Sequence, residues 1–246
     1  MKYEGFLICT DMDGTFSVTE ENIKAIKDFQ AEGGRFTVAT GRNISYIDEF
    51  FGKLEIKPNA PAIMCNGGVI YDYSENKIIQ ENFIAPESFE GFFETATKLQ
   101  VKLRISQRGK TLETENVIAP SELIEYDKMY KAVWHTSDNM AALEKYINEN
   151  YSDDFEISKS CSFLIEANKK GISKSSGTLF VKEYTKCHTL ICAGDYGNDI
   201  PMLKTADISY AVENAIDDVK KAAMRVTVKN TDSAIARIIK DIEESL

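Results

Sequence analysis

The sequence predicts an α/β fold in which a parallel-sheet core carries an inserted α+β module. The first observation is that apolar runs of strand length alternate with helical patterns over residues 1–84. The second is that this alternation stops near residue 85, and the third is that it returns after residue 168. Because repeated strand–helix–strand units build parallel sheets, we expect residues 1–84 and 169–246 to form one core domain and residues 85–168 a second, inserted domain.

The N-terminal segment begins with the apolar run Phe6–Thr10, which is typical of a buried strand. Thr19 is placed to cap a helix, and Gly33 with Gly34 supplies the usual end of one. The other elements expected here are strands at residues 36–40 and 62–65, a helix through Ile47, Phe50 and Phe51, and a hairpin of residues 69–73 and 77–81.

The middle of the chain lacks strict strand–helix alternation, which favours a separate α+β module. Its clearest elements are helices at residues 87–99 and 138–151 and strands at residues 102–107, 110–115 and 131–135. The alternating pattern then resumes, with strands expected at residues 188–193, 208–212 and 226–228 and helices at residues 173–184, 199–205, 215–224 and 233–244.

Composition narrows the possible functions. A net charge of -10 argues against a nucleic-acid or anionic-membrane surface. No apolar run approaches membrane-spanning length, and the N-terminus lacks the pattern of a signal peptide. The five cysteines show no metal-type pairing, so we expect buried free thiols in a reducing cytoplasm. We therefore expect a cytoplasmic protein without nucleic-acid or membrane partners. A monomer or a homodimer is expected, and the composition does not distinguish the two.

Polar side chains gather in four short stretches, at strand ends or a helix start. These are Asp11 and Asp13 in Asp-Met-Asp-Gly-Thr, Thr40 in Thr-Gly-Arg, Lys174 in Gly-Ile-Ser-Lys, and Asp195 and Asp199 in Gly-Asp-Tyr-Gly-Asn-Asp. Each stretch alone also fits an ordinary turn, a helix cap or a solvated charge. A lysine in the first helical turn opposes the helix dipole, which favours a functional role for Lys174.

Together these residues have the chemistry that phosphoryl transfer requires. A carboxylate can attack phosphorus and form an aspartyl-phosphate. Mg²⁺ prefers a few carboxylate oxygens with water and phosphate, and Asp11, Asp195 and Asp199 offer such oxygens. Lys174 and Thr40 supply a cation and a hydroxyl donor for the phosphate. Asp13 can act as general acid if the surrounding acids raise its pKa.

The motifs in this order resemble the haloacid dehalogenase (HAD) superfamily, and more narrowly its Cof-type sugar-phosphate phosphatases. Asn66-Gly67-Gly68 and Val212-Glu213-Asn214-Ala215 also resemble loops of that branch. The resemblance implies a Rossmann-like core with a cap domain inserted after the third strand, and it implies roles for individual residues. These are Asp11 as nucleophile, Asp13 as general acid/base, Thr40, Gly41, Arg42, Asn66, Lys174 and Asn198 as substrate-binding residues, and Asp11, Asp13 (through its carbonyl), Asp195 and Asp199 around Mg²⁺.

One departure from the branch lies near the C-terminus. The branch commonly has Asp-Gly-Val-Ala before its last helix, where this chain has Asp232-Ser233-Ala234-Ile235-Ala236. The departure concerns the form of this loop and leaves the catalytic motifs untouched.

The expected function is a Mg²⁺-dependent phosphatase acting through an aspartyl-phosphate on a small phosphorylated metabolite, a sugar phosphate being one candidate. A phosphotransferase or phosphomutase with the same intermediate, and a non-catalytic phospho-ligand binder, are the alternatives. The second carboxylate, Asp13, argues against a dehalogenase, because a halide leaving group needs no proton. The cap residues that could meet a leaving group are Arg104, Arg108, Trp134 and His135, although surface charge or core packing is the alternative for each of them.

Overall fold

A parallel sheet forms the centre of the first part of the molecule. The computed structural model describes residues 1–113 and 126–245. The sheet's strands are β1 (Phe6–Thr10), β2 (Arg35–Val38), β11 (Thr189–Gly194), β12 (Ile208–Ala211) and β13 (Arg225–Val226). They lie in the order β13-β12-β11-β1-β2, as expected for a Rossmann-like core. The order reverses at β1, and open α/β sheets bind ligands at such a point.

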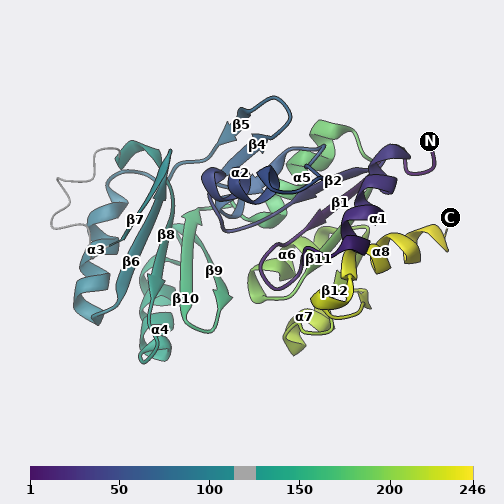
Figure 1. Ribbon diagram of the computed structural model, residues 1–246. Coiled ribbons are helices and arrows are strands. Elements are labelled where there is room, and N and C mark those ends of the chain that lie inside the picture. The colour runs from purple at the N-terminus through teal and green to yellow at the C-terminus, as the bar shows by residue number, and fades with distance from the viewer. Residues whose placement is uncertain (114–125, 246) are drawn as a thin grey trace.

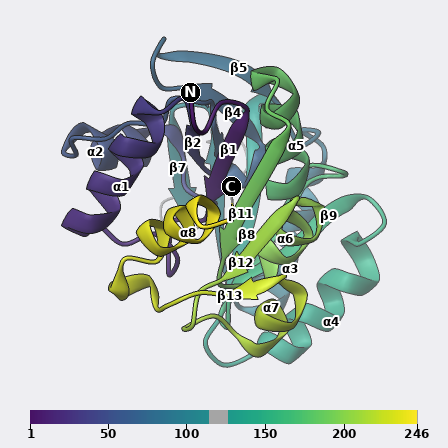
Figure 2. The same ribbon diagram turned by 90° about the vertical axis from the view of Figure 1, so that its right-hand side faces the viewer.

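Helices cover both faces of this sheet (Figure 2). One face packs against α1 (Glu20–Ala31), α2 (Ile44–Gly52) and α8 (Ala234–Glu243). The other face packs against α5 (Lys174–Thr185), α6 (Ile200–Thr205) and α7 (Asp217–Ala222). No helix within the described ranges is long and apolar enough to cross a bilayer.

The strand expected at residues 62–65 has a different setting from the one predicted. The strands β3 (Ala62–Met64), β4 (Val69–Asp72) and β5 (Lys77–Glu81) form a small antiparallel sheet. A single parallel bridge between Ala39 and Ile63 joins β3 to the end of β2. The chain turns back after β3 through a short 3₁₀ helix, Cys65–Gly67, and this reversal makes the pairing with β4 antiparallel.

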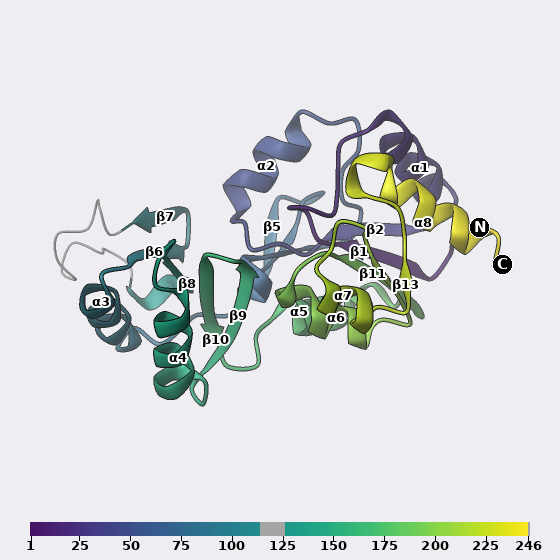
Figure 3. The same cartoon turned by 90° about the horizontal axis from the view of Figure 1, so that it is seen from below.

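A second, antiparallel sheet lies beside the first part of the molecule (Figures 1 and 3). Its strands are β6 (Lys102–Gln107), β7 (Lys110–Glu113), β8 (Met129–His135), β9 (Phe155–Cys161) and β10 (Leu164–Lys169). They lie in the order β7-β6-β8-β10-β9, with helices α3 (Ser88–Leu99) and α4 (Met140–Tyr151). We call residues 102–169 with these two helices the second module. The end of the strand predicted at 110–115 lies outside the described residues.

The second sheet has an apolar face and a polar face. Leu103, Trp134 and Ile165 pack with residues of α3 and α4 in a core of their own. Because side chains alternate along a strand, Lys131 and Glu166 lie on the opposite face, in the cleft between the two sheets. The polar face of the second sheet therefore lies across the cleft from the carboxyl ends of β1 and β11.

Ser233 explains the departure near the C-terminus. Its backbone is left-handed, with a φ of 58°, a conformation in which glycine is the least strained residue. Its hydroxyl forms a 2.8 Å hydrogen bond with the Thr19 hydroxyl at the start of α1. Serine therefore holds a position that suits glycine, with a side-chain contact that glycine cannot make.

Candidate active site

Carboxylates converge where the parallel sheet reverses its strand order. Asp11 directly follows β1, while Asp195 and Asp199 follow the neighbouring strand β11. One carboxylate oxygen from each of these residues lies within 4.8 Å of the others. Asp11 and Asp199 are buried, and Asp195 is partly exposed. Three of the sequence-predicted acids thus form one compact cluster that could hold a cation.

Lys174 is the positive charge inside this cluster. It is the first residue of α5, where Ser173 caps the helix by accepting a hydrogen bond from the amide of Ser176. The buried Lys174 Nζ donates to Asp11 Oδ1 at 2.5 Å and to Asp199 Oδ1 at 2.7 Å. The lysine expected at a helix start therefore lies between two buried carboxylates.

The charge of this cluster is not balanced by Lys174 alone. Burial, together with the charges of Asp199 and Asp195, raises the pKa of Asp11 well above its ordinary value, despite the opposing effect of Lys174. Burial and Asp199 likewise raise the pKa of Asp195. Burial acts to lower the pKa of Lys174, but the carboxylates of Asp11 and Asp199 together outweigh it and raise that pKa. A further cation would therefore favour the ionised carboxylates.

Backbone and hydroxyl donors fix the orientation of the acids. Asp199 Oδ2 accepts from the amides of Asp195 at 3.0 Å and Tyr196 at 3.2 Å. Thr15 Oγ1 donates to Asp195 Oδ1 at 2.9 Å. Gly14 has a φ of +88°, and a Cβ there would lie 2.3 Å from Asp195 Oδ2. The Asp-Gly-Thr segment therefore fixes the position of the Asp195 carboxylate.

Replacing Gly14 by alanine should displace the Asp195 carboxylate. We expect Gly14→Ala to weaken the binding of a divalent cation to the cluster by about 10- to 100-fold, as losses of ligand-orienting contacts do, and isothermal titration calorimetry with Mg²⁺ measures this directly. Gly109→Ala is the matched control, because Gly109 has a φ of +78° but a Cβ there would meet no atom of the described residues within 4 Å. Equal Mg²⁺ affinity in the two variants would contradict the assigned place of Asp195.

Asp13 lies in a different setting from the one expected. Arg42 Nε and Nη2 donate to its two carboxylate oxygens, each at 2.9 Å. The Arg42 guanidinium also lies 4.4 Å from the ring centre of Tyr46. Asp13 is exposed, and its carboxylate is the largest cause that raises the pKa of Arg42. Acidic neighbours were expected around Asp13, but in the structure its carboxylate forms an ion pair with Arg42.

The loop of Thr40, Gly41 and Arg42 is interlocked with the turn that contains Asn66. The buried Thr40 Oγ1 accepts from the Arg42 amide at 3.1 Å. The amide of Cys65 donates to the carbonyl of Arg42, and the amide of Asn66 donates to that of Thr40, both at 2.9 Å. Asn66 itself is buried in a left-handed conformation, with a φ of 56°.

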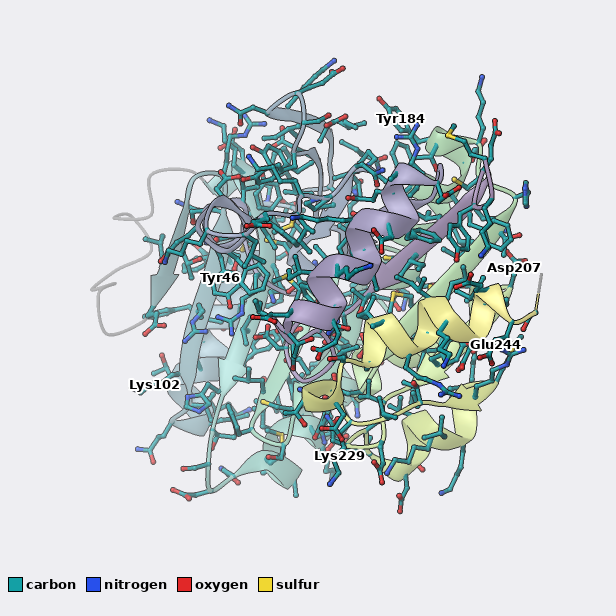
Figure 4. The ribbon with its side chains drawn as sticks, turned by 45° about the vertical axis from the view of Figure 1, so that its right-hand side comes forward. Tyr46, Lys102, Tyr184, Asp207, Lys229 and Glu244 are labelled. Carbon is teal, nitrogen blue, oxygen red and sulfur yellow. The ribbon has the colours of Figure 1, made fainter. Side chains whose placement is uncertain are left out.

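A cleft of about 710 Å³ opens over these residues from the side of the second sheet. From the first part of the molecule its walls include Asp11, Asp13, Gly41, Arg42, Lys174, Asp195 and Asn198. The other sequence-predicted residues, Thr40, Asn66 and Asp199, are buried beside it. Figure 4 shows Tyr46 of α2 on the side toward the second module, whereas Asp207 and Glu244 lie at the opposite end. The cleft thus brings together motifs from both ends of the chain.

Comparison with known proteins identifies the family. A family model described as haloacid dehalogenase-like hydrolase matches residues 8–239, nearly the whole chain. This chain belongs to the haloacid dehalogenase-like hydrolases. The resemblance to the Cof-type branch of the HAD superfamily is thereby confirmed, and so is the expected phosphatase class, because the curated relatives below are phosphatases.

Two curated relatives and one solved structure represent these similarities. The chain is 26% identical to 5-amino-6-(5-phospho-D-ribitylamino)uracil phosphatase YcsE of Bacillus subtilis, over 95% of this chain and 94% of that protein. It is 24% identical to pyridoxal phosphate phosphatase YbhA of Escherichia coli, over 95% and 97%. The HAD phosphatase BT1666 of Bacteroides thetaiotaomicron shares the fold, with a TM-score of 0.83, 21% identity and coverage of 98% and 96%.

The HAD-like site also contains residues that the sequence analysis missed. Thr15 holds Asp195, and the ion pair of Lys131 with Glu166 lines the cleft opposite the acids. Thr15 belongs to the first motif, so its hydroxyl was visible there as a possible donor. Lys131 and Glu166 had a weaker signal, since each is a charged residue between two uncharged neighbours in its strand.

The residues of the second module that could contact a leaving group lie in different surroundings. Arg104 lines the cleft and pairs with Glu113. Trp134 is fully buried in the core, where its Nε1 donates to the carbonyl of Phe92, so the alternative of core packing holds for this residue. Arg108 pairs with Glu81 of β5, and the ring of His135 packs on that of Phe163.

Proposed function

We propose that this HAD-like hydrolase is a Mg²⁺-dependent phosphomonoesterase that acts on a small phosphorylated metabolite through an aspartyl-phosphate on Asp11. The observation that carries this proposal is the buried contact of Lys174 with both Asp11 and Asp199 beneath an open cleft. A structural salt bridge needs one carboxylate for one lysine. A cluster with excess negative charge suits a site that receives a cation and a phosphate.

The residues present fit Mg²⁺. Oxygens of Asp11, Asp195 and Asp199 lie close enough to share one ion, and Mg²⁺ favours carboxylate oxygens that leave room for water and substrate. In the proposed site these carboxylates and the carbonyl of Asp13 hold the ion. When bound, it offsets the negative charge of the phosphate and keeps Asp11 ionised.

The proposed reaction has two displacements at phosphorus. A carboxylate oxygen of Asp11 forms a bond to phosphorus while the bond to the leaving oxygen breaks. A water molecule then attacks the aspartyl-phosphate, which releases inorganic phosphate and restores Asp11. Lys174, Thr40, Gly41 and Asn198 are proposed to hold the phosphoryl oxygens, where donors placed in advance stabilise developing charge.

Asp13 is proposed to give the leaving oxygen its proton and to accept one from the attacking water. In the structure both of its carboxylate oxygens are occupied by Arg42. The proposed role therefore requires Arg42 to release Asp13. The incoming phosphate ester offers the guanidinium a substitute partner, since arginine binds phosphate in the same bidentate manner as carboxylate.

We propose that residues 85–168 serve as a cap that selects the leaving group, while residues 1–84 and 169–246 carry the chemistry. The cleft contains ion pairs such as Arg104 with Glu113, together with hydroxyls such as Ser106 and Thr111. Paired charges and hydroxyls suit a neutral, hydroxyl-bearing leaving group such as a sugar. The relative YcsE is named for a substrate with a phosphorylated ribityl chain, which is consistent with this proposal.

We also propose that the protein works in the cytoplasm as a monomer or homodimer, without nucleic-acid or membrane partners. All five cysteines are free, which suits a reducing compartment. The net charge of -10 is unfavourable for binding to polyanions.

Phosphate release from a panel of phosphorylated metabolites tests the proposed function. We expect turnover in Mg²⁺ that falls to background when EDTA is added and returns when Mg²⁺ is restored. Transfer of phosphate to an acceptor hydroxyl, with little free phosphate, would assign a phosphotransferase instead. Unchanged turnover in EDTA would contradict the metal, and binding without any turnover would make the protein a phospho-ligand binder.

A further inference from the structure

The second module contributes a buried ion pair to the cleft. Lys131 of β8 and Glu166 of β10 lie 2.9 Å apart, and each side chain is only 4% exposed. Both lie on the polar face of their sheet, in strands whose other side packs against α3 and α4. Burying two charges is costly unless further hydrogen bonds satisfy them, so the remaining partners of this pair matter.

Those remaining partners belong to the first part of the molecule. Lys131 Nζ donates to the carbonyl of Gly41 at 2.8 Å. Asn66 Nδ2 donates to Glu166 Oε2 at 2.5 Å. Burial raises the pKa of Glu166, but Lys131 and Asn66 outweigh burial and hold it below its ordinary value. The buried pair thus connects the second module to the loop of Gly41 and the turn of Asn66.

Gly41 has no side chain at the point where Lys131 approaches the backbone. A Cβ at this position would lie 2.9 Å from Lys131 Nζ and 3.3 Å from Asn66 Oδ1. Gly41 is not among the residues with positive φ, so backbone strain does not explain the glycine. A side chain at position 41 would instead displace the Lys131 Nζ from its present place. Among the described side chains, Asn66 Oδ1 is one of the buried polar atoms without a hydrogen-bond partner, and it lies beside Gly41.

The contact reaches the residues proposed to bind phosphate. Gly41 lies between Thr40 and Arg42, whose carbonyls accept the amides of Asn66 and Cys65. Asn168, which follows Glu166 on the same strand, donates to the carbonyl of Cys65 at 2.8 Å. A shift of Lys131 or Glu166 would therefore be transmitted to both loops through short hydrogen bonds.

We propose that Lys131 and Glu166 are positioning residues, which hold the Thr40–Arg42 loop and Asn66 in the geometry that receives phosphate when the second module is docked. This proposal rests on the proposed phosphatase function for its catalytic consequence. The docking itself rests only on the contacts between Lys131, Glu166, Gly41 and Asn66.

Two variants separate positioning from simple stabilisation. Lys131→Met alone leaves Glu166 buried without its cation, so it should lower the melting temperature as well as the activity. The double variant Lys131→Met/Glu166→Gln removes both charges at similar volume. We expect it to regain most of the melting temperature while kcat/KM for para-nitrophenyl phosphate with Mg²⁺ stays about a hundredfold low, the effect of a misplaced binding loop.

The matched control is Lys159→Met/Glu144→Gln. Lys159 and Glu144 also pair at 2.9 Å, but within the second module, and this variant should keep wild-type kcat/KM. A Lys131→Met/Glu166→Gln protein with wild-type melting temperature and wild-type kcat/KM would show that the pair is only structural and overturn the proposal.

Amide hydrogen exchange gives a second measurement that needs no turnover. The amides of Cys65 and Asn66 donate to the Thr40–Arg42 loop, so they should exchange faster in Lys131→Met/Glu166→Gln than in wild type or in the control variant. Unchanged exchange there would overturn the docking role. If the wild type releases no phosphate at all, the phosphatase proposal fails, while exchange at these amides still decides whether Lys131 and Glu166 hold the loop.

Discussion

Asp11→Asn is expected to lower kcat for phosphate release by about 10⁴-fold or more, the scale seen when a catalytic nucleophile is removed. An amide is a poor nucleophile and cannot form the acyl-phosphate. Asn at this position keeps nearly the same shape, so Lys174 and Asp199 can stay in contact. Release of inorganic phosphate from para-nitrophenyl phosphate in saturating Mg²⁺ measures the effect.

The Asp11→Asn protein should remain folded, because it loses one of several crowded carboxylates. Burial and the neighbouring acids raise the pKa of Asp11, so its charge is unfavourable in the metal-free fold. The control is Asp28→Asn, which makes the same change at an exposed carboxylate on α1. If Asp11→Asn released phosphate as fast as this control, Asp11 would not be the nucleophile.

Lys174→Met is expected to have the largest effect on the stability of the metal-free protein. It leaves the buried carboxylates of Asp11 and Asp199 without their shared cation. Breaking a buried pair in this way costs about 3–5 kcal/mol of unfolding free energy. Urea unfolding in EDTA measures the loss, and added Mg²⁺ should restore part of it, because the ion supplies positive charge to the same carboxylates.

Lys182→Met is the matched control for Lys174→Met. Lys182 lies on the same helix and also pairs with an aspartate, Asp207, but both side chains are partly exposed. Its loss should change the unfolding free energy by no more than about 1 kcal/mol. Equal losses in the two variants, or no recovery of Lys174→Met with Mg²⁺, would contradict the proposed balance of charge in the cluster.

The acid cluster was predictable because the residues next to each motif indicate whether the motif follows a strand or begins a helix. Asp11 and Asp195 follow apolar runs that are typical of buried strands, and parallel strands place their carboxyl ends at one edge. Lys174 follows a serine that caps a helix. These signals need only the period of the hydrophobic pattern and the chemistry of the next few residues. Each of these signals is contained in a stretch of about ten residues.

The partners of Asp13 and Gly41 were not predictable in the same way. Asp13 binds an arginine 29 positions away, and Gly41 receives a lysine 90 positions away in the inserted module. No local rule connects such residues, because their distance depends on how one sheet docks on the other. The pairing of β3 was not predictable either. Its apolar run fits a parallel strand as well as the antiparallel strand that it forms with β4.

By itself, then, the sequence determined the α/β class, the strand ends that carry the acids and the lysine at the start of α5, because hydrophobic period and capping act over short range. Only the tertiary structure decided that Asp13 pairs with Arg42, that β3 turns back into an antiparallel sheet, and that Lys131 and Glu166 close on Gly41 and Asn66. Those outcomes depend on packing between segments that are far apart in the chain. Which side chains meet there is decided by how the segments are buried against one another, and no local sequence pattern specifies this.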